Sequence, residues 1–527
     1  MSAQTPEFGK WRSFFWPVHA YELKKLLPMF LMFFFISFNY TILRDTKDTL
    51  VITAAGSGAE AVPFLKVWGV LPCAVIVMII YAKLSNKLSK AGLFYATILP
   101  FIIFFGLFST ILYPLRDHLH PTVMADKLQA LLPPGMMGFI AIFRNWTFSL
   151  FYILAELWGS VVLSLLFWGF ANDIMKVTEA KRFYTLLGVG ANLALMFSGP
   201  AIVLASHIRQ KVPAHLDAWG ISLHILMAMV VVSGLCIVGI YYWIQKNVLT
   251  DERFYSVKEQ TTAKKEKPKM SLKESFLFLV KSKYIGFLAI LVISYGIAIN
   301  IVEVTWKSQL KLQYPNSNDY STFMGFFSFT TGCISVLMML FVGGNVIRRF
   351  GWGTAALITP VVLLITGIIF FSFVIFKGSL MGVVAMLGTT PLFLAVIVGA
   401  LQNIMSKSSK YSLFDPTKEM AYIPLDQESK VKGKAAIDVV GARFGKSGGS
   451  LIQQALIIGS ASGLVIDVAP YLAIILFAII FVWIFAAKFL SKLFQQKITE
   501  KAEHTEPVVV SKVTNKISKE KEETASV

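Results

Sequence analysis

Long apolar segments recur along the chain and alternate with shorter polar ones. Each apolar segment has about twenty residues, the length that crosses a hydrocarbon core of roughly 30 Å as a helix. The pattern predicts an all-α polytopic membrane protein with twelve transmembrane helices. We place these spans near 25–44, 63–82, 92–113, 138–170, 184–204, 221–245, 284–305, 320–342, 353–376, 381–403, 434–460 and 466–490.

The longest hydrophilic interruption falls midway and divides the spans equally. A duplicated plan of this kind places the substrate site between the two halves, near the bilayer midplane. We therefore expect two pseudo-symmetric six-helix bundles that rock about a central cavity, as in the major facilitator fold. The predicted parts are a cytoplasmic N-terminus at 1–24, bundles at 25–245 and 284–490, a cytoplasmic linker at 246–283, and a disordered cytoplasmic tail at 491–527.

Two short similarities between the halves fit this duplication. Lys47 in "DTKDTL" of the first span aligns with Lys307 in "TWKSQL" of the seventh. Asn192, which ends "GAN" in the fifth span, aligns with Arg443, which ends "GAR" in the eleventh. Both pairs occupy corresponding helices of the two predicted bundles, as an internal repeat requires.

Composition agrees with a membrane protein and argues against a soluble enzyme. Hydrophobic residues make up 56% of the 527 residues and charged ones only 15%, against roughly 25% charged in soluble domains. The three cysteines, Cys73, Cys236 and Cys333, show no pairing pattern, so we expect neither disulfides nor a metal centre. We find no set of catalytic residues and no cleavable signal, and we expect a transporter without a cofactor.

The formal net charge of +19 follows the predicted topology. Basic residues gather before the first span and after the second, fourth, sixth, eighth and tenth spans, while the opposite loops have few. Since cytoplasmic loops carry the excess of Lys and Arg, both termini are predicted to face the cytoplasm. The charge therefore does not indicate nucleic acid as a partner. We expect a monomer in the inner (cytoplasmic) membrane of a bacterial cell, in contact with the lipid bilayer.

Several ionisable residues fall within or beside the spans, where a charge costs roughly 2.5–3.5 kcal/mol. Arg44, Lys47 and Asp48 share one helix face at positions i, i+3 and i+4. One interpretation is a substrate site, and the other is that the acids neutralise the bases at a helix end. In the seventh span Glu303 and Lys307 lie on one stripe.

The fourth span carries a second stripe, and the eleventh carries a basic pair. Glu156 and Glu303 supply one carboxylate per half, which fits either proton coupling or pairing with a cation. Arg443 and Lys446 lie among glycines that allow close approach of helices. The surplus of bases predicts a polyanionic substrate. The fourth-span residues are Asn145, Tyr152 and Glu156, with Arg144 just before them.

Four strings resemble the nucleotide translocases of obligate intracellular bacteria and plastids. They are "LRDTKDTL", "AELWGS", "EVTWKSQLKLQYP" and "KEMAYIPLDQESKVKGKAAIDVV", within a match over about 8–490. The chain looks like the ATP/ADP-exchanging branch of chlamydia-like energy parasites. This resemblance implies antiport of host ATP against ADP, and it leaves open whether phosphate moves alongside ADP. It does not exclude the proton-coupled nucleotide symporters of the same family.

The resemblance also implies roles for particular residues. The family's essential cavity charges fall on Lys47, Glu156, Glu303 and Lys446, and Asn192 falls where a family asparagine takes part in phosphate recognition. We expect the two lysines to contact phosphate and the two glutamates to hold the bases or contact the substrate. Further expected supports of the substrate site are Arg44, Arg144, Tyr152, Lys307 and Arg443.

Overall fold

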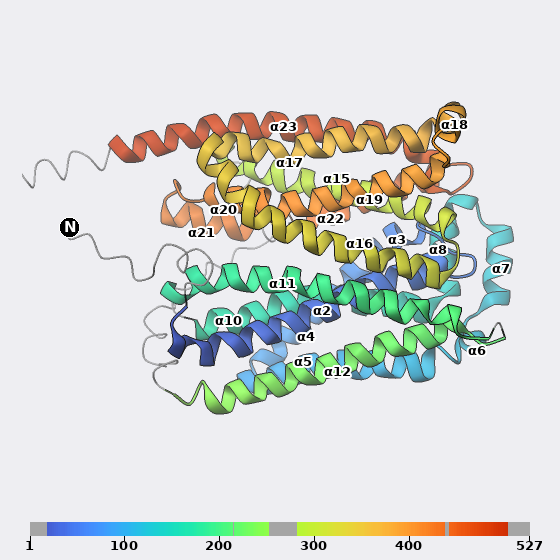
Figure 1. Cartoon of the computed structure of the whole chain (residues 1–527), viewed down its shortest axis with the longest axis horizontal. Helices are drawn as coiled ribbons and strands as arrows, with labels where there is room; N and C mark the ends of the chain where they lie inside the picture. The colour runs from blue at the N-terminus through green and yellow to red at the C-terminus, as the bar shows by residue number, and fades with distance from the viewer. Residues whose placement is uncertain (1–17, 176, 214, 252–281, 438–441, 504–527) are drawn as a thin grey trace, which may run out of the picture.

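The computed structural model describes residues 18–175, 177–213, 215–251, 282–437 and 442–503. Every regular element in these ranges is a helix, which confirms the predicted all-α class. Most of the helices run along the long axis of the molecule (Figure 1). The helices of the first half lie in the lower part of that view, and those of the second half lie in the upper part.

The first half contains long helices interrupted by short 3-10 and π-helical turns, which carry the label η. In chain order its elements are η1 (Ala20–Glu22), α2 (Leu23–Thr53), α3 (Ala61–Phe64), η2 (Leu65–Val70), α4 (Leu71–Ser85), α5 (Lys90–Leu107), η3 (Phe108–Leu112), α6 (Arg116–Leu119), α7 (Thr122–Leu131), η4 (Pro134–Met136), α8 (Met137–Arg144), α9 (Trp146–Leu157), η5 (Trp158–Phe167), α10 (Trp168–Ile174), α11 (Val177–Ser206), η6 (His207–Gln210) and α12 (Ala218–Asn247).

The second half likewise contains long helices interrupted by short η segments. Its elements are α15 (Lys283–Gln313), α16 (Ser317–Leu337), η7 (Met338–Gly343), α17 (Gly344–Ile375), α18 (Lys377–Ala385), α19 (Pro391–Ser409), η8 (Lys410–Phe414), α20 (Asp415–Met420), α21 (Gln427–Ala436), α22 (Ala442–Gly459) and α23 (Val465–Glu503). Both α2 and α23 have their outer ends at the left of Figure 1, so the two described chain ends lie at the same end of the molecule.

The number of spans differs from the prediction. Ten helices in the described ranges are long and apolar enough to cross a membrane, so the count of twelve is not confirmed by that criterion. One of the ten, Ser317–Ile375, covers two predicted spans, and its backbone breaks at Gly351, where φ is 78°. The predicted span at 434–460 falls mainly on α22, which carries charged and glycine residues and is not among the ten, and residues 438–441 lie outside the description.

Three predicted boundaries were wrong. Helix α23 continues to Glu503, so residues 491–503 of the predicted disordered tail are helical. The predicted span at 381–403 begins only at Pro391, which opens α19, and the residues before it form the separate short helix α18. The predicted span at 138–170 is broken at Asn145, where the backbone has φ −110° and ψ 47°. The Asn145 amide donates to the carbonyls of Ala55 and Ala141, which stabilises this break.

The acidic and basic cluster of the first span lies inside a helix. Helix α2 continues for 31 residues through this cluster to Thr53. The alternative that these charges mark a helix end is therefore wrong. Since Asp45, Lys47 and Asp48 are all at most 3% exposed, they must find partners within the protein.

The two halves meet along α11 and α16. A Cβ atom on Gly199 would lie 2.6 Å from the carbonyl oxygen of Gly325, so these two helices approach as closely as their backbones allow. At the end of this contact, Ser206 Oγ donates to Ser321 Oγ at 2.9 Å, and Arg209 forms an ion pair with Asp319 at 2.5 Å. We call the end that carries α6, α7 and α18, opposite the described chain ends, the distal end.

Candidate functional site

A carboxylate buried between the halves receives a lysine from each half. Asp48 on α2 accepts from Lys47 Nζ at 3.0 Å and from Lys307 Nζ of α15 at 2.7 Å. All three side chains are at most 4% exposed. The two lysines that align in the sequence repeat thus meet at one acid, and the bridge to Lys307 joins the two bundles.

A glutamate from each half extends this centre. Glu156 on α9 lies 3.3 Å from Lys47, and Glu303 on α15 lies 3.0 Å from Lys307. The two glutamates are 22% and 20% exposed, so they border open space while the lysines behind them are covered. The Lys47 ammonium also lies 3.8 Å from the centre of the Tyr152 ring, a favourable cation–π contact.

A second cross-bundle contact lies one turn earlier on α2. Arg44 Nε donates to Asp45 at 3.0 Å, and its Nη2 donates to Ser328 Oγ of α16 at 2.8 Å. Ser328 in turn donates to the other carboxylate oxygen of Asp45 at 2.5 Å. These three bonds close a triad across the interface, which anchors α2 to the second half.

Lys446 on α22 faces open space beside these charges. Its side chain is exposed, yet its charge interacts with those of Glu156 and Glu303 and with Tyr40 and Tyr411. No carboxylate of the described residues lies within 4.0 Å of its ammonium, unlike that of Lys47. Tyr40 precedes Lys47 by seven residues, or about 10 Å along α2, toward the end where α2 begins. Lys446 therefore lies on the side of the cluster that faces the described chain ends.

Two cavity lysines were missed by the sequence analysis. Lys66 on η2 donates to Asn300 Oδ1 of α15 at 2.7 Å, and Lys407 on α19 lies 4.0 Å from Glu303. Lys66 lies within a predicted apolar span, so the cost of a charge there was a usable signal. The predicted span 381–403 places Lys407 in a cytoplasmic loop, whereas α19 continues to Ser409 and brings this lysine to the cluster.

Some expected site residues lie elsewhere. Arg144 pairs with Asp126 of α7 at 2.6 Å and donates to Gln129, so the structure does not bring it to the charge cluster. Asn192 is buried on α11, where its amide donates to the Gly188 carbonyl at 3.0 Å. The side chain of Arg443 lies outside the described part of the structure. The remaining seven belong to the cluster described above: Arg44, Lys47, Tyr152, Glu156, Glu303, Lys307 and Lys446.

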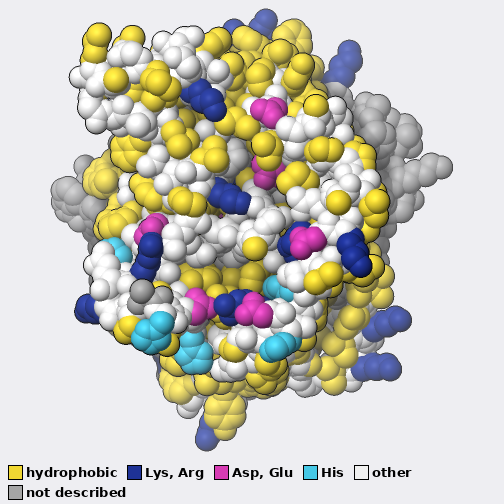
Figure 2. All heavy atoms as spheres, turned by 90° about the vertical axis from the view of Figure 1, so that its right-hand side faces the viewer, with side chains coloured by type: hydrophobic (Ala, Val, Ile, Leu, Met, Phe, Trp, Pro, Cys, Tyr) yellow, Lys and Arg dark blue, Asp and Glu magenta, His cyan; other side chains and the backbone are white. Residues whose placement is uncertain are grey.

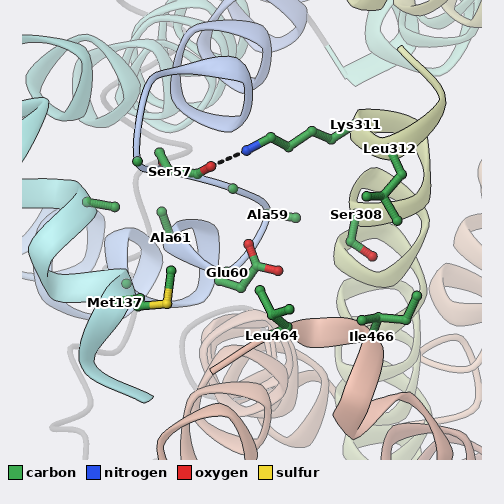
Figure 3. Close-up of a pocket in the computed structure, with 14 residues that line it drawn as sticks. Ser57, Ala59, Glu60, Ala61, Met137, Ser308, Lys311, Leu312, Leu464 and Ile466 are labelled. Carbon is green, nitrogen blue, oxygen red and sulfur yellow. Dashed lines mark hydrogen bonds between the residues drawn. The ribbon is translucent and has the colours of Figure 1, made fainter. Parts of the chain in front are cut away.

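A separate pocket lies beside the loop between α2 and α3, where Ser308 and Lys311 of α15 also line it (Figure 3). Lys311 reaches across it and donates to the Ser57 carbonyl of the loop between α2 and α3. Glu60, from the same loop, accepts from the backbone N–H of Val465 in the second half at 3.2 Å. The pocket has a volume of about 170 Å³, below the roughly 300 Å³ of small-molecule sites. We interpret it as the remnant of a closed pathway, not as the substrate site.

The distal end has no broad surface of one charge in the view of Figure 2, since acidic and basic side chains lie side by side there. Ion pairs account for several of them, including Arg116 with Asp217 at 3.0 Å. The concentrated positive charge of the described residues is instead inside, where six bases meet four acids. The bases are Arg44, Lys47, Lys66, Lys307, Lys407 and Lys446, and the acids are Asp45, Asp48, Glu156 and Glu303.

This geometry suits a polyanion. Ammonium and guanidinium groups form strong charge-assisted hydrogen bonds with phosphate oxygens. In the described structure, Lys47 and Lys307 share the Asp48 carboxylate, which a phosphate could replace, and the side chain of Lys446 is exposed. When no substrate is bound, ion pairs satisfy Lys47 and Lys307, whereas Lys66 and Lys446 have no carboxylate of the described residues within 4.0 Å.

Comparison with known proteins also identifies carriers of phosphate-containing anions as relatives. The family model "TLC ATP/ADP transporter" matches residues 1–494. A protein of Chlamydia pneumoniae called "ADP,ATP carrier protein 1" is 67% identical over 488 residues, which cover 92% of this chain and 94% of that protein. The Arabidopsis thaliana "ADP,ATP carrier protein 1, chloroplastic" is 55% identical over 92% of this chain and 76% of its own length. The "ADP,ATP carrier protein 1" of Rickettsia bellii is 46% identical over 92% of this chain and 96% of its own length.

Solved structures of transporters share the fold. A bacterial homologue of the iron transporter ferroportin in an inward-facing state gives a TM-score of 0.52 at 13% identity, over 91% of this chain and 99% of that one. A D-xylose–proton symporter gives 0.51 at 12% identity, over 89% and 97%. These likenesses support the expected major facilitator-like architecture. The long, highly identical sequence matches show that the chain belongs to the TLC ATP/ADP transporter family and is a membrane transporter, not an enzyme.

Proposed function

We propose that the chain is an antiporter that exchanges external ATP for internal ADP by alternating access. The observation that carries this proposal is the buried bridge of Asp48 with Lys47 and Lys307, which joins the two halves at a centre rich in bases. Relatives with up to 67% identity are called ADP,ATP carriers, which supports adenine nucleotides as the polyanions.

In this proposal Lys47 and Lys446 contact the phosphates. Lys47 already lies between two carboxylates, and Lys446 has its ammonium in the open part of the cavity. Glu156 and Glu303 hold the lysines in place when the site is empty. An incoming polyphosphate replaces these carboxylates and Asp48 as the partner of the lysines, so the Asp48–Lys307 bridge between the bundles is released only when substrate compensates the charges.

This charge balance favours exchange over one-way transport. An empty cluster has more bases than acids, and moving unpaired charge past an apolar barrier is expensive. A bound nucleotide offsets that surplus in each direction. The exchange of ATP for ADP carries one net negative charge unless phosphate or a proton moves as well, and we include phosphate with ADP as a testable variant of the cycle.

The positive-inside pattern supports an inner-membrane orientation with both chain ends in the cytoplasm. The distal end then faces outward. Because Lys311, Glu60 and the Arg209–Asp319 pair close that end, the structure corresponds to a state that opens toward the cytoplasm. This is the state from which internal ADP would bind.

Counter-exchange in proteoliposomes tests the proposal. Vesicles loaded with ADP should take up labelled ATP, whereas empty vesicles should take up very little. Equal uptake into both would rule out obligate exchange. An imposed pH gradient that drives ATP accumulation into empty vesicles would instead show the proton-coupled symporter, and labelled phosphate inside the vesicles would report its exit with ADP.

A further inference from the structure

Lys66 is a charged residue of the cluster to which no role has yet been assigned. Its ammonium donates to the neutral amide oxygen of Asn300 at 2.7 Å. Among the described residues, no carboxylate lies within 4.0 Å of this ammonium, whereas Lys47 and Lys307 each have two. The charge of Lys66 nevertheless interacts with those of Glu156 and Glu303, so it belongs to the same cavity.

Local backbone structure gives Lys66 an unusual position. It lies in η2, a π-helical segment between α3 and α4. Such segments are rare, and they occur often at functional sites because they shift the side chains away from regular helical spacing. Here the segment directs a lysine of the first half toward α15 of the second half.

Asn300 links Lys66 to the helix that carries Lys446. Its Nδ2 donates to the Lys446 carbonyl and to Ser450 Oγ, both at 2.7 Å. The backbone carbonyl of Asn300 also accepts a hydrogen bond from Gln453 Nε2 at 2.9 Å. All donors and acceptors of its side chain are thus used between Lys66 and α22.

Close packing makes this link precise. A Cβ atom on Gly296 would lie 2.7 Å from the Cα atom of Gly445, so α15 and α22 touch through their backbones one turn before Asn300. The amide of Asn300 can therefore reach the backbone at Lys446 only while these helices stay in contact. A shift of α22 would break both the Asn300 bonds and the position of Lys446.

We propose that Lys66 is a further phosphate-binding residue and that Asn300 is the positioning residue that sets Lys66 and Lys446 against the same polyphosphate. This inference rests on the proposed function, since it assigns another contact of that site. A charge with only a neutral partner is expensive inside a membrane protein. A phosphate supplies the missing anion, and the two lysines approach it from different halves.

The alternative is that Lys66 only tethers η2 to α15. The substitution Lys66→Gln separates the two roles, because a glutamine amide still donates a hydrogen bond but carries no charge. Lys66→Arg keeps the charge. Lys83→Gln, at an exposed lysine of α4 in the same helical span, is the matched control.

The experiment measures the Kd for ATP and for tripolyphosphate with the full chain in detergent. Loss of a charged hydrogen bond predicts that Lys66→Gln raises both Kd values by roughly 10-fold to 100-fold. Lys66→Arg should raise the two Kd values less, and Lys83→Gln should have the Kd values of the wild type. Wild-type Kd values for both ligands in folded Lys66→Gln would overturn the assignment.

A second measurement needs no variant. Saturating ATP should slow the acetylation of Lys66 in the wild-type protein, read by mass spectrometry, and leave Lys83 unaffected. An unchanged acetylation rate at Lys66 would contradict the proposal. If the proposed function were wrong, vesicles with the wild-type protein would show no ATP/ADP exchange. Binding of tripolyphosphate would still test whether Lys66 contacts an anion.

Discussion

Asp48→Asn is the most informative single change, because it removes one charge and leaves the shape nearly unchanged. The wild-type carboxylate is 1% exposed and accepts from Lys47 and Lys307. With asparagine, two buried ammonium groups keep Glu156 and Glu303 as partners but lose their shared acid. The cross-bundle ion pair disappears with it.

The magnitude follows from the distances. At separations of 2.7 and 3.0 Å and an effective dielectric constant near 20, each attraction is about 6 kcal/mol before desolvation is subtracted. Burying the carboxylate offsets most of that gain. Measured losses after removing one partner of a buried pair are about 3–5 kcal/mol, and we expect Asp48→Asn to fall in this range.

The assay is thermal unfolding of the purified protein in detergent, with and without ATP. Without nucleotide the variant should melt several degrees below wild type, and ATP should restore more stability to it than to wild type because phosphate replaces the missing anion. The ATP Kd should fall, since the competing acid is gone, while exchange slows. As the control, Asp173→Asn removes an exposed pair with Lys90 and should cost at most about 1 kcal/mol. A variant that melts like wild type and binds ATP no more tightly would refute the reasoning.

Three further results are expected. Lys47→Ala and Lys446→Ala should each abolish ATP binding by folded protein, and normal binding by both would remove the phosphate assignment. Lys311→Met loses its bond to the α2–α3 loop, so an impermeant thiol reagent added outside should label a cysteine at Ser308 faster, and unchanged labelling would argue against a distal closure. Arg144→Ala removes a buried guanidinium that pairs with the exposed Asp126 carboxylate, so it should lower stability by about 1–3 kcal/mol and leave the ATP Kd unchanged; a weakened Kd would return Arg144 to the site.

The sequence predicted the class of fold well and its boundaries less well. Hydrophobic periodicity and length are strong signals for membrane helices, and they located α5 and α12 closely. They could not locate the break at Asn145, because it depends on amide bonds to carbonyls from another segment. The late start at Pro391 was also hidden, since α18 before it is nearly as apolar as a membrane helix.

The charge cluster was predictable because buried charge is costly wherever it occurs. That reasoning found Lys47, Glu156 and Glu303, which the structure brings together. It could not show that Arg144 has a local partner in α7, since Asp126 lies outside the predicted spans. Lys66 was a different case, because its only signal was a single charge in an otherwise apolar segment.

The lysines that align in the predicted repeat meet at a carboxylate that only one half supplies. Lys47 and Lys307 occupy equivalent positions in the two halves, and both reach Asp48, although only the first half supplies that acid. The symmetric lysines offer similar contacts to a substrate that arrives from either side. The asymmetric acid instead ties the halves together when the site is empty, because Lys307 must cross the interface to reach it. A polyphosphate that binds both lysines would replace this bridge by its own charge, and we infer that occupancy and release of the interface are therefore one event.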